Sequence, residues 1–432
     1  MGPSVMHTHR LFVILLAAVT TGCGMLHVKE QQAKMDAFCV IGGRVEAERK
    51  DAVPLVVVLA RQTGADPMQR DSWQVADHFV LEEPGQWQFF ASPGTYGVVA
   101  FQDLNGDLKA QAGEPYLRLE RERLFTCKPG ERVADVALRI PAAGRSRLNE
   151  TIDIAALQAR SNNDQFALTL TQVTAVGEIT DLGDPRFADA IANDGLWKPF
   201  DFLFKGRPGV YFLQAYDRKK IPVLFVHGIN GSPTNFKTLI ERLDHDRYQP
   251  WVYYYPGGAS LANVADHLAQ TMRKLHVQYD FPQFVVVAHS MGGLVSRGFL
   301  QRYHAGGGAK IPGFISISSP FDGHKAAETG VKTAPRVVRV WIDMSPGSDY
   351  LKSIFAGELG VPHYLLFGFR QSGGLHIGGE ANDGVVTVAS QLRPDAQEHA
   401  VRVEGFNETH MGILESKEVS QKVNGLLAKL AR

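Results

Sequence analysis

The stretch VVVAHSMGGLVSR, residues 285 to 297, runs from an apolar segment through a short turn into a helical pattern. The three valines and the alanine that come first are typical of a strand buried on both faces of a parallel sheet. Ser290 follows in a turn, with Ala288 two residues before it and Gly292 two residues after it. A tight turn from strand to helix needs such small neighbours. We therefore expect the turn to present Ser290 at the carboxyl edge of a sheet, where ligands bind.

Segments that favour strands alternate with segments that favour helices from residue 208 to the end of the chain. This alternation predicts an α/β domain, a mainly parallel sheet that helices cover on both faces. The helical segments are SPTNFKTLIERLD (232–244), with Ser232 as its cap, LANVADHLAQTMRKL (261–275) and SKEVSQKVNGLLAKL (416–430). The expected strands are IPVLFVHG (221–228), WVYYYPGG (251–258), FVVVAHS (284–290), GFISISSP (313–320), HYLLFGF (363–369) and AVRVEGF (400–406).

The residues AHSMGG (288–293) resemble the nucleophile elbow of the α/β-hydrolase family, with Ala288 in place of the more common first glycine. The resemblance implies a triad in the order serine, acid, histidine, with Ser290 as the nucleophile. His410 in GFNETHMGIL follows the last strand and is the expected base. Asp383 in ANDGVVTVASQL lies in a segment similar to the one that carries the acid in bacterial lipases. Asp343 in WIDMSPGSDYL is the alternative acid.

The segment VHGING (226–231) resembles the His-Gly loop of lipases. This resemblance implies that the backbone N–H groups of Ile229 and Met291 form the oxyanion hole. His227 is then expected to hold the loop by hydrogen bonds, and His289 to pack beside the elbow. His399 precedes the last strand, so we expect it at the opposite edge of the sheet.

Residues 321–360 form a long excursion between two strands, where this family inserts a cap or lid. The segments SSPFDGH and DMSPGSDYL are similar to bacterial triacylglycerol lipases and to their relatives that resemble inositol-lipid deacylases. The resemblance implies hydrolysis of carboxylic esters, with lipid esters as the expected substrates and with no cofactor or metal. A mobile lid and a fixed cap both remain open. An acyltransferase with the same triad and a catalytically idle cell-envelope binding protein are alternative functions.

Residues 1–22 have the features of a secretory signal, with Arg10 followed by the apolar run LFVILLAAV. AVTTGC (18–23) resembles a bacterial lipobox, except that Thr20 stands where that family usually has Leu. The resemblance implies that Cys23 carries a lipid, and Gly24 in place of Asp favours the outer membrane, with the protein facing the periplasm. Residues 23–35 are the expected tether, and ordinary signal cleavage is the alternative.

Residues 36–142 contain short strand-like runs separated by the turns EPG, SPG and KPG, which predicts an antiparallel β-sandwich. The stretch from 93 to 115 resembles prealbumin-like and carboxypeptidase-regulatory-like accessory domains. Cys39 and Cys127 are an even pair in a chain bound for an oxidising compartment, and they form either a disulfide or two buried thiols. Residues 143–207 are the expected connector and 208–432 the catalytic domain.

Four residues of this domain have the spacing of a calcium loop, but Gly106 stands at the fourth position, where the loop needs glycine at the sixth. An ordinary turn is therefore the stronger prediction. Forty-five basic side chains balance forty-five acidic ones, so the overall charge does not favour nucleic acid as a partner and says nothing of oligomeric state. The four residues with calcium-loop spacing are Asp103, Asn105, Asp107 and Glu114.

Overall fold

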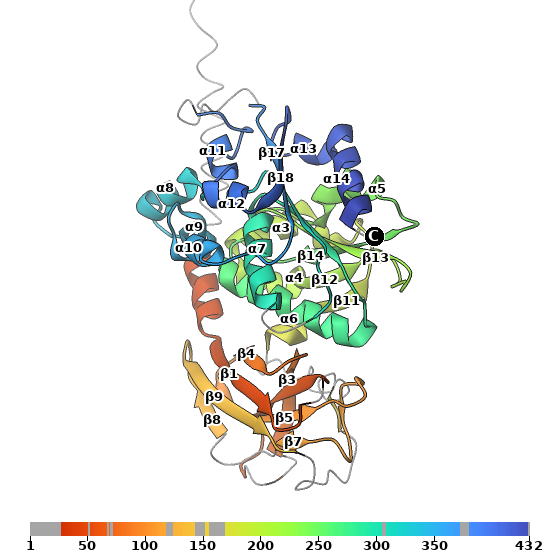
Figure 1. Cartoon of the computed structure of the whole chain (residues 1–432). Coiled ribbons are helices and arrows are strands. Elements are labelled where there is room, and N and C mark those ends of the chain that lie inside the picture. The colour runs from red at the N-terminus through yellow and green to blue at the C-terminus, as the bar shows by residue number, and fades with distance from the viewer. Residues whose placement is uncertain are drawn as a thin grey trace, which may run out of the picture.

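The protein is described by a computed structural model that covers residues 27–50, 52–66, 69, 72–117, 124–142, 152–154, 169–304, 308–371 and 380–430. The expected signal and Cys23 lie outside these residues. Figure 1 shows a smaller all-β part packed beneath a larger α/β part, with helix α6 (Leu261–Tyr279) facing the smaller one. Among the described residues there is no helix with the length and apolar character to cross a bilayer.

An eight-stranded sheet forms the centre of the α/β part, in the order β11-β12-β14-β13-β15-β16-β17-β18. All neighbouring strands run parallel except β12 and β14, which confirms the predicted mainly parallel sheet. The strands are β11 (Ala175–Ile179), β12 (Gly209–Phe212), β13 (Ile221–Val226), β14 (Tyr248–Tyr254), β15 (Val285–His289), β16 (Phe314–Ile317), β17 (His363–Gly368) and β18 (Ala400–Phe406).

Successive side chains of the central strands enter two different hydrophobic cores, one on each face of the sheet. In β13, Leu224 and Val226 belong to one core, while Val223 and Phe225 belong to the other. This is the arrangement that makes a doubly covered strand apolar at every position. Helix α6 and helix α7 (Met291–His304) cover the first face, and α5 (Lys237–Glu241) and α14 (Lys417–Leu430) cover the second.

The other helices of this part are short. A 3-10 turn, Pro233–Phe236, opens the predicted helix at 232, and its Asn235 side chain accepts a hydrogen bond from the Ser232 N–H at 2.9 Å. The remaining helices are α3 (Asp189–Trp197), α4 (Pro199–Lys205), α8 (Lys325–Thr333), α9 (Arg339–Met344), α10 (Asp349–Phe355), α11 (Val388–Gln391), α12 (Pro394–Glu398) and α13 (Gly412–Glu415), with 3-10 turns at Leu170–Val173 and Pro185–Phe187.

Two expected boundaries are wrong. Strand β11 and helices α3 and α4 fall inside the expected connector 143–207, yet β11 pairs with β12 in the main sheet. Buried Phe187 and Phe202 anchor this segment in the second core, although its short, mixed sequence has no clear period. Likewise a helix over 27–36 covers most of the expected tether 23–35, and its Gln31 side chain accepts a hydrogen bond from the Asp201 N–H at 3.0 Å.

The amino-terminal part consists of two sheets, β4-β1-β9 and β3-β2-β5-β7, with β8 paired to β5. Both sheets contribute to one core that includes Trp87 and Tyr96. All pairs are antiparallel except β1 with β9, which differs from the fully antiparallel prediction. The strands are β1 (Cys39–Ala47), β2 (Leu55–Gln62), β3 (Trp73–Leu81), β4 (Gly85–Ala91), β5 (Gly94–Gln102), β7 (Tyr116–Leu117), β8 (Leu124–Cys127) and β9 (Arg132–Ile140), with β6 (Lys109–Ala110) paired to β10 (Ile152–Asp153).

A disulfide joins Cys39 on β1 to Cys127 on β8, with the two Cα atoms 6.1 Å apart. Because β8 pairs with β5, this bond links the two sheets. In the turn after β5, the Asp103 carboxylate binds the backbone. It accepts hydrogen bonds from the N–H groups of Gly106, Asp107 and Leu108. These contacts are those of an ordinary turn.

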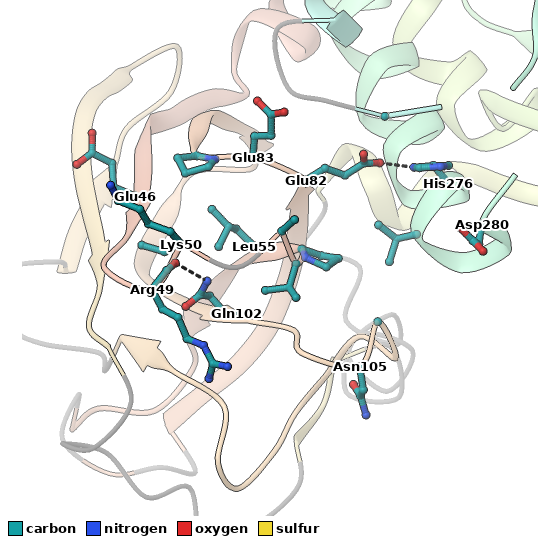
Figure 2. A pocket seen from close by; sticks show the side chains of 18 residues that line it. Glu46, Arg49, Lys50, Leu55, Glu82, Glu83, Gln102, Asn105, His276 and Asp280 are labelled. Carbon is teal, nitrogen blue, oxygen red and sulfur yellow. Dashed lines mark hydrogen bonds and ion pairs between the residues drawn. The ribbon is translucent and has the colours of Figure 1, made fainter. Parts of the chain in front are cut away.

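The amino-terminal part packs against α6 along a surface that we call the seam. Lys274 Nζ lies 3.3 Å from Asp77 Oδ1, with both side chains more than nine-tenths buried. Gln270 donates to the Gln88 carbonyl at 3.2 Å. Figure 2 shows Glu82 reaching across the seam to pair with His276. Charged and polar contacts therefore hold the two parts together at α6.

Candidate active site

Ser290 lies at a strained turn between β15 and α7. Its φ of +54° is in the left-handed region, which non-glycine residues adopt rarely and mostly where the surroundings impose it. A Cβ on Gly292 would lie 2.2 Å from the Val226 carbonyl oxygen, and one on Gly228 would lie 2.8 Å from Ser290 Cβ. The turn therefore requires glycine at both places, because the end of β13 passes against it.

The structure brings the three predicted residues together. Ser290 Oγ lies 2.9 Å from His410 Nε2, and His410 Nδ1 lies 2.8 Å from Asp383 Oδ2. Ser290 comes from the end of β15, Asp383 from the loop after β17 and His410 from the loop after β18, all at the carboxyl edge of the sheet. Ser290 is 4% exposed, His410 6% and Asp383 0%, so the hydrogen bonds lie almost out of water.

Asp383 is held as an anion. Its Oδ1 accepts hydrogen bonds from the N–H groups of Val385 at 3.0 Å and Val386 at 2.7 Å. Burial alone would raise the pKa of the Asp383 carboxyl, but His410 and these two amides together lower that pKa below its ordinary value. Oδ2 is thereby left to accept a hydrogen bond from His410 Nδ1–H, which turns Nε2 toward the Ser290 hydroxyl.

Asp343, the alternative acid, lies outside this cluster. Its Oδ2 accepts a hydrogen bond from the Leu261 N–H at 2.7 Å, at the first turn of α6. A carboxylate there satisfies an unpaired amide and faces the positive end of the helix dipole. Asp343 therefore has the contacts of a helix cap.

Hydrogen bonds fix the loop after β13. His227 Nδ1–H donates to the Gly228 carbonyl at 2.8 Å, and Nε2 accepts from the Tyr255 N–H at 3.3 Å. The Tyr255 hydroxyl donates to the His227 carbonyl at 2.5 Å, and the two rings stack. Burial lowers the pKa of His227 to about 4, which keeps the ring neutral at pH 7. His227 thus has the loop-holding contacts that we expected.

The two predicted oxyanion donors belong to the start of α7 and to the loop after β13. Met291 is the first residue of α7, and the first amides of a helix have no partner within it. Ile229 follows Gly228, the glycine whose missing side chain lets the loop approach Ser290. Both N–H groups therefore come from segments that lie against the serine.

Sequence reasoning missed two histidines that support the site. His289 Nε2–H donates to the His410 carbonyl at 2.8 Å, whereas only packing was expected. Burial, and then the nearby His410, lower the pKa of His289 to about 3. His324, at the start of α8, donates from Nε2 to the Val385 carbonyl at 2.8 Å. Neither contact has a signal in the sequence, because each joins segments far apart in the chain. His399 is exposed at the start of β18, at the edge opposite His410.

Residues 321–360 pack as part of the core. Leu351 and Ile354 on α10 are fully buried, and Arg297 Nε donates to the Ile354 carbonyl at 2.7 Å. The Tyr350 hydroxyl donates to the Leu294 carbonyl of α7 at 3.0 Å. These contacts join α10 to α7. Across the described ranges, no His, Cys, Asp and Glu side chains gather in groups that could hold a metal ion.

Several known proteins are similar to this chain. A lipase from Bacillus licheniformis, BlEst2, is 18% identical over 50% of this chain and 94% of its own, with a TM-score of 0.38. An esterase from Thermogutta terrifontis is 18% identical over 50% and 92%, with a TM-score of 0.33. The phospholipase PlaB from Legionella pneumophila is 19% identical over 40% and 45%, with a TM-score of 0.33. No curated protein matches the sequence significantly.

Residues 221–342 match the family model of the alpha/beta hydrolase fold. The match begins at β13 and ends in the cap, so it includes the elbow at Ser290. The order of the strands, the turn after β15 and this match agree with one another. The carboxy-terminal part of the chain, preceded by an all-β part, therefore has the α/β-hydrolase fold.

Proposed function

We propose that the protein is a serine hydrolase that cleaves carboxylic esters through an acyl-enzyme intermediate. The observation that carries this proposal is the unbroken hydrogen-bond chain from Ser290 through His410 to Asp383. A serine hydroxyl is a weak nucleophile unless a base removes its proton, and the base must be oriented by a third group. The same geometry argues against the idle binding protein.

In the proposed reaction, Ser290 Oγ attacks the ester carbonyl carbon while His410 Nε2 takes the hydroxyl proton. The tetrahedral intermediate collapses when His410 returns this proton to the leaving alcohol. Water then attacks the carbonyl carbon of the acyl-enzyme while His410 Nε2 takes a proton from it. His410 returns this proton to Ser290 Oγ as the carboxylic acid leaves. Asp383 stays ionised throughout and stabilises the imidazolium that forms twice in each cycle. The N–H groups of Ile229 and Met291 would bind the carbonyl oxygen as it becomes negative.

A fluorophosphonate probe tests the proposal directly, because it forms a covalent bond only with an activated serine. We expect one adduct, which mass spectrometry of a tryptic digest locates on Ser290. The Ser290→Ala variant should remain unlabelled. An unlabelled wild-type protein that is folded would instead support the idle binding protein. With an alcohol added as acceptor in water, an acyltransferase would convert most of the acyl groups into a new ester, whereas a hydrolase would release mainly the free acid.

We further propose lipid esters as the substrates. Exposed apolar side chains stand beside the triad: Val385 two residues after Asp383 and Met411 directly after His410 are 42% and 47% exposed. Phe369, which follows β17 at the same edge, is 44% exposed. Such a rim suits an acyl chain or a lipid surface better than a charged substrate. A series of p-nitrophenyl esters of increasing chain length tests this: we expect kcat/KM to rise with length, and a maximum at acetate would contradict it.

Lipid attachment at Cys23 and a place at the outer membrane remain proposals, which rest on the lipobox-like AVTTGC. Two or more acyl chains would hold the protein firmly on a bilayer. We expect wild-type protein in the membrane fraction and Cys23→Ser protein either in the soluble fraction or as an uncleaved precursor. Wild-type protein that is wholly soluble, with a free mature amino terminus, would exclude the anchor.

A further inference from the structure

The seam contains a second cavity that the proposed catalysis does not use. It has a volume of about 810 Å³ and lies between strands β1, β4 and β9 on one side and helix α6 on the other. A neighbouring cavity of about 1130 Å³, drawn in Figure 2, is lined by Glu46, Glu82 and Glu83 as well as by basic side chains. The smaller cavity differs because basic groups outnumber acidic ones in it. Its charged lining is Arg44, Arg132, Arg273, Arg302, Asp135 and Asp266.

Two of the four guanidinium groups are already paired. Arg44 Nε lies 3.2 Å from Glu46, and Arg302 Nε lies 2.5 Å from Asp266. Within the residues that the structure describes, no carboxylate lies within ion-pair distance of Arg132 or Arg273. Asp266 interacts electrostatically with both, but its carboxylate is already paired with Arg302, so basic groups remain in excess in the cavity.

Arg273 is the unusual member, since its side chain is 94% buried, with only 6% exposed. One of its terminal nitrogens donates to the Arg302 carbonyl, but its Nε has no hydrogen-bond partner. Removing a guanidinium from water is costly unless an anion or a full set of acceptors replaces the water. Burial accordingly lowers the pKa of Arg273. This buried charge has backbone carbonyls and the Tyr303 ring as neighbours, but no carboxylate at ion-pair distance in the described part of the chain.

We propose that this cavity binds a phosphate-bearing ligand. Arginine forks bind phosphate with pairs of parallel hydrogen bonds, and a phosphate group has enough oxygens to engage Arg132 and Arg273 together. The volume is far larger than one inorganic ion needs and is in the range of pockets that hold small molecules. The ligand is therefore a phosphate ester, either a free small molecule or the headgroup of an anionic phospholipid.

Binding to the full-length protein tests the proposal, with glycerol 3-phosphate, inorganic phosphate and citrate as soluble probes in calorimetric titrations. Vesicles of phosphatidylcholine, alone or mixed with phosphatidylglycerol, are the lipid probes, and a Cys23→Ser background removes any anchor. Arg132→Gln changes an exposed residue and should weaken binding about tenfold or more, the usual worth of a charge-assisted contact. Arg139→Gln is the matched control, because Arg139 is exposed on the same strand but does not line the cavity.

Saturable binding of glycerol 3-phosphate that Arg132→Gln weakens and Arg139→Gln does not would support a free phosphate ester as the ligand. Binding confined to vesicles with phosphatidylglycerol, with the same dependence on Arg132, would support a lipid headgroup. Arg273→Gln should abolish either one, while hydrolysis of p-nitrophenyl acetate shows that the variant is folded. Equal losses in Arg132→Gln and Arg139→Gln, tighter binding of citrate than of both phosphate probes, or no saturable binding to any probe would overturn the proposal.

Discussion

The sheet edge that carries Ser290, which we call the catalytic edge after its proposed role, and the seam both bury charged groups, but these groups have different partners. At the catalytic edge, Asp383 receives hydrogen bonds from His410 and two backbone amides, so its charge is balanced before any substrate arrives. At the seam, Lys274 is paired with Asp77, whereas the adjacent Arg273 on α6 forms no ion pair within the described part of the chain, and its Nε has no hydrogen-bond partner. A reaction needs its supporting dipoles in place while charge develops. A binding site instead contains a charged group whose counter-ion the ligand supplies.

At the catalytic edge, the largest expected loss of activity follows substitution of Ser290. We expect Ser290→Ala to lower kcat on the order of 10⁶-fold, as removal of the nucleophile does in a comparable triad. Stability should change little, since one hydroxyl is lost. Ser296→Ala on α7 is the control, because this buried hydroxyl has no hydrogen-bond partner in the structure. Ester hydrolysis near the wild-type rate in Ser290→Ala would mean that another residue attacks the substrate.

Asp383→Asn should lower kcat about 10⁴-fold, because an amide favours the wrong tautomer of His410. Asp343→Asn is the matched control. It should keep near wild-type kcat and lower the free energy of unfolding by only about 0.5 kcal/mol, because the amide oxygen can still accept the Leu261 N–H and only the charge near the helix dipole is lost. Steady-state kinetics and urea unfolding distinguish the two effects. The assignment of the acid would be wrong if Asp343→Asn lost activity and Asp383→Asn kept it.

At the seam, the largest expected loss of stability follows substitution of Lys274. Lys274→Met leaves Asp77 buried and without its cation, which should lower the free energy of unfolding by about 3–5 kcal/mol. Lys237→Met is the surface counterpart: Lys237 Nζ lies 3.9 Å from Glu241 in the open, and its loss should cost less than about 0.5 kcal/mol. Urea unfolding measures both. Equal losses of unfolding free energy in the two variants would show that the ion pair at the seam is as exposed to water as the surface pair.

Gly228→Ala should have the smallest of these effects. The new methyl would lie 2.8 Å from Ser290 Cβ and 3.2 Å from Ser290 Oγ, so the serine or the loop must move. A displacement of this size costs about 10²-fold in kcat when reacting atoms need close alignment. Gly357→Ala, with no atom within 4 Å of the added carbon, should leave kcat unchanged. A fully active Gly228→Ala variant would imply that the loop after β13 yields easily.

Local patterns were enough to predict most of the α/β part and its three proposed catalytic residues. Strands such as β13 and β15 are apolar at every position because both faces are covered, and that composition can be read directly. Ser290 could be found because the turn limits its neighbours to small residues. The expected connector failed where these signals weaken: β11 is a short edge strand, and Phe187 and Phe202 lie in segments without a clear period.

Long-range contacts account for what could not be read from the chain. Asp383 and Asp343 were both possible acids, and the choice depended on which carboxylate the folded loops bring to His410. The hydrogen bonds of His289 and His324 and the burial of Arg273 with its unsatisfied Nε likewise arise between segments distant in sequence. Composition and periodicity act over one or two turns of backbone, so they specify elements and tight turns. Distances between side chains depend on how the elements pack, and no local pattern records that packing.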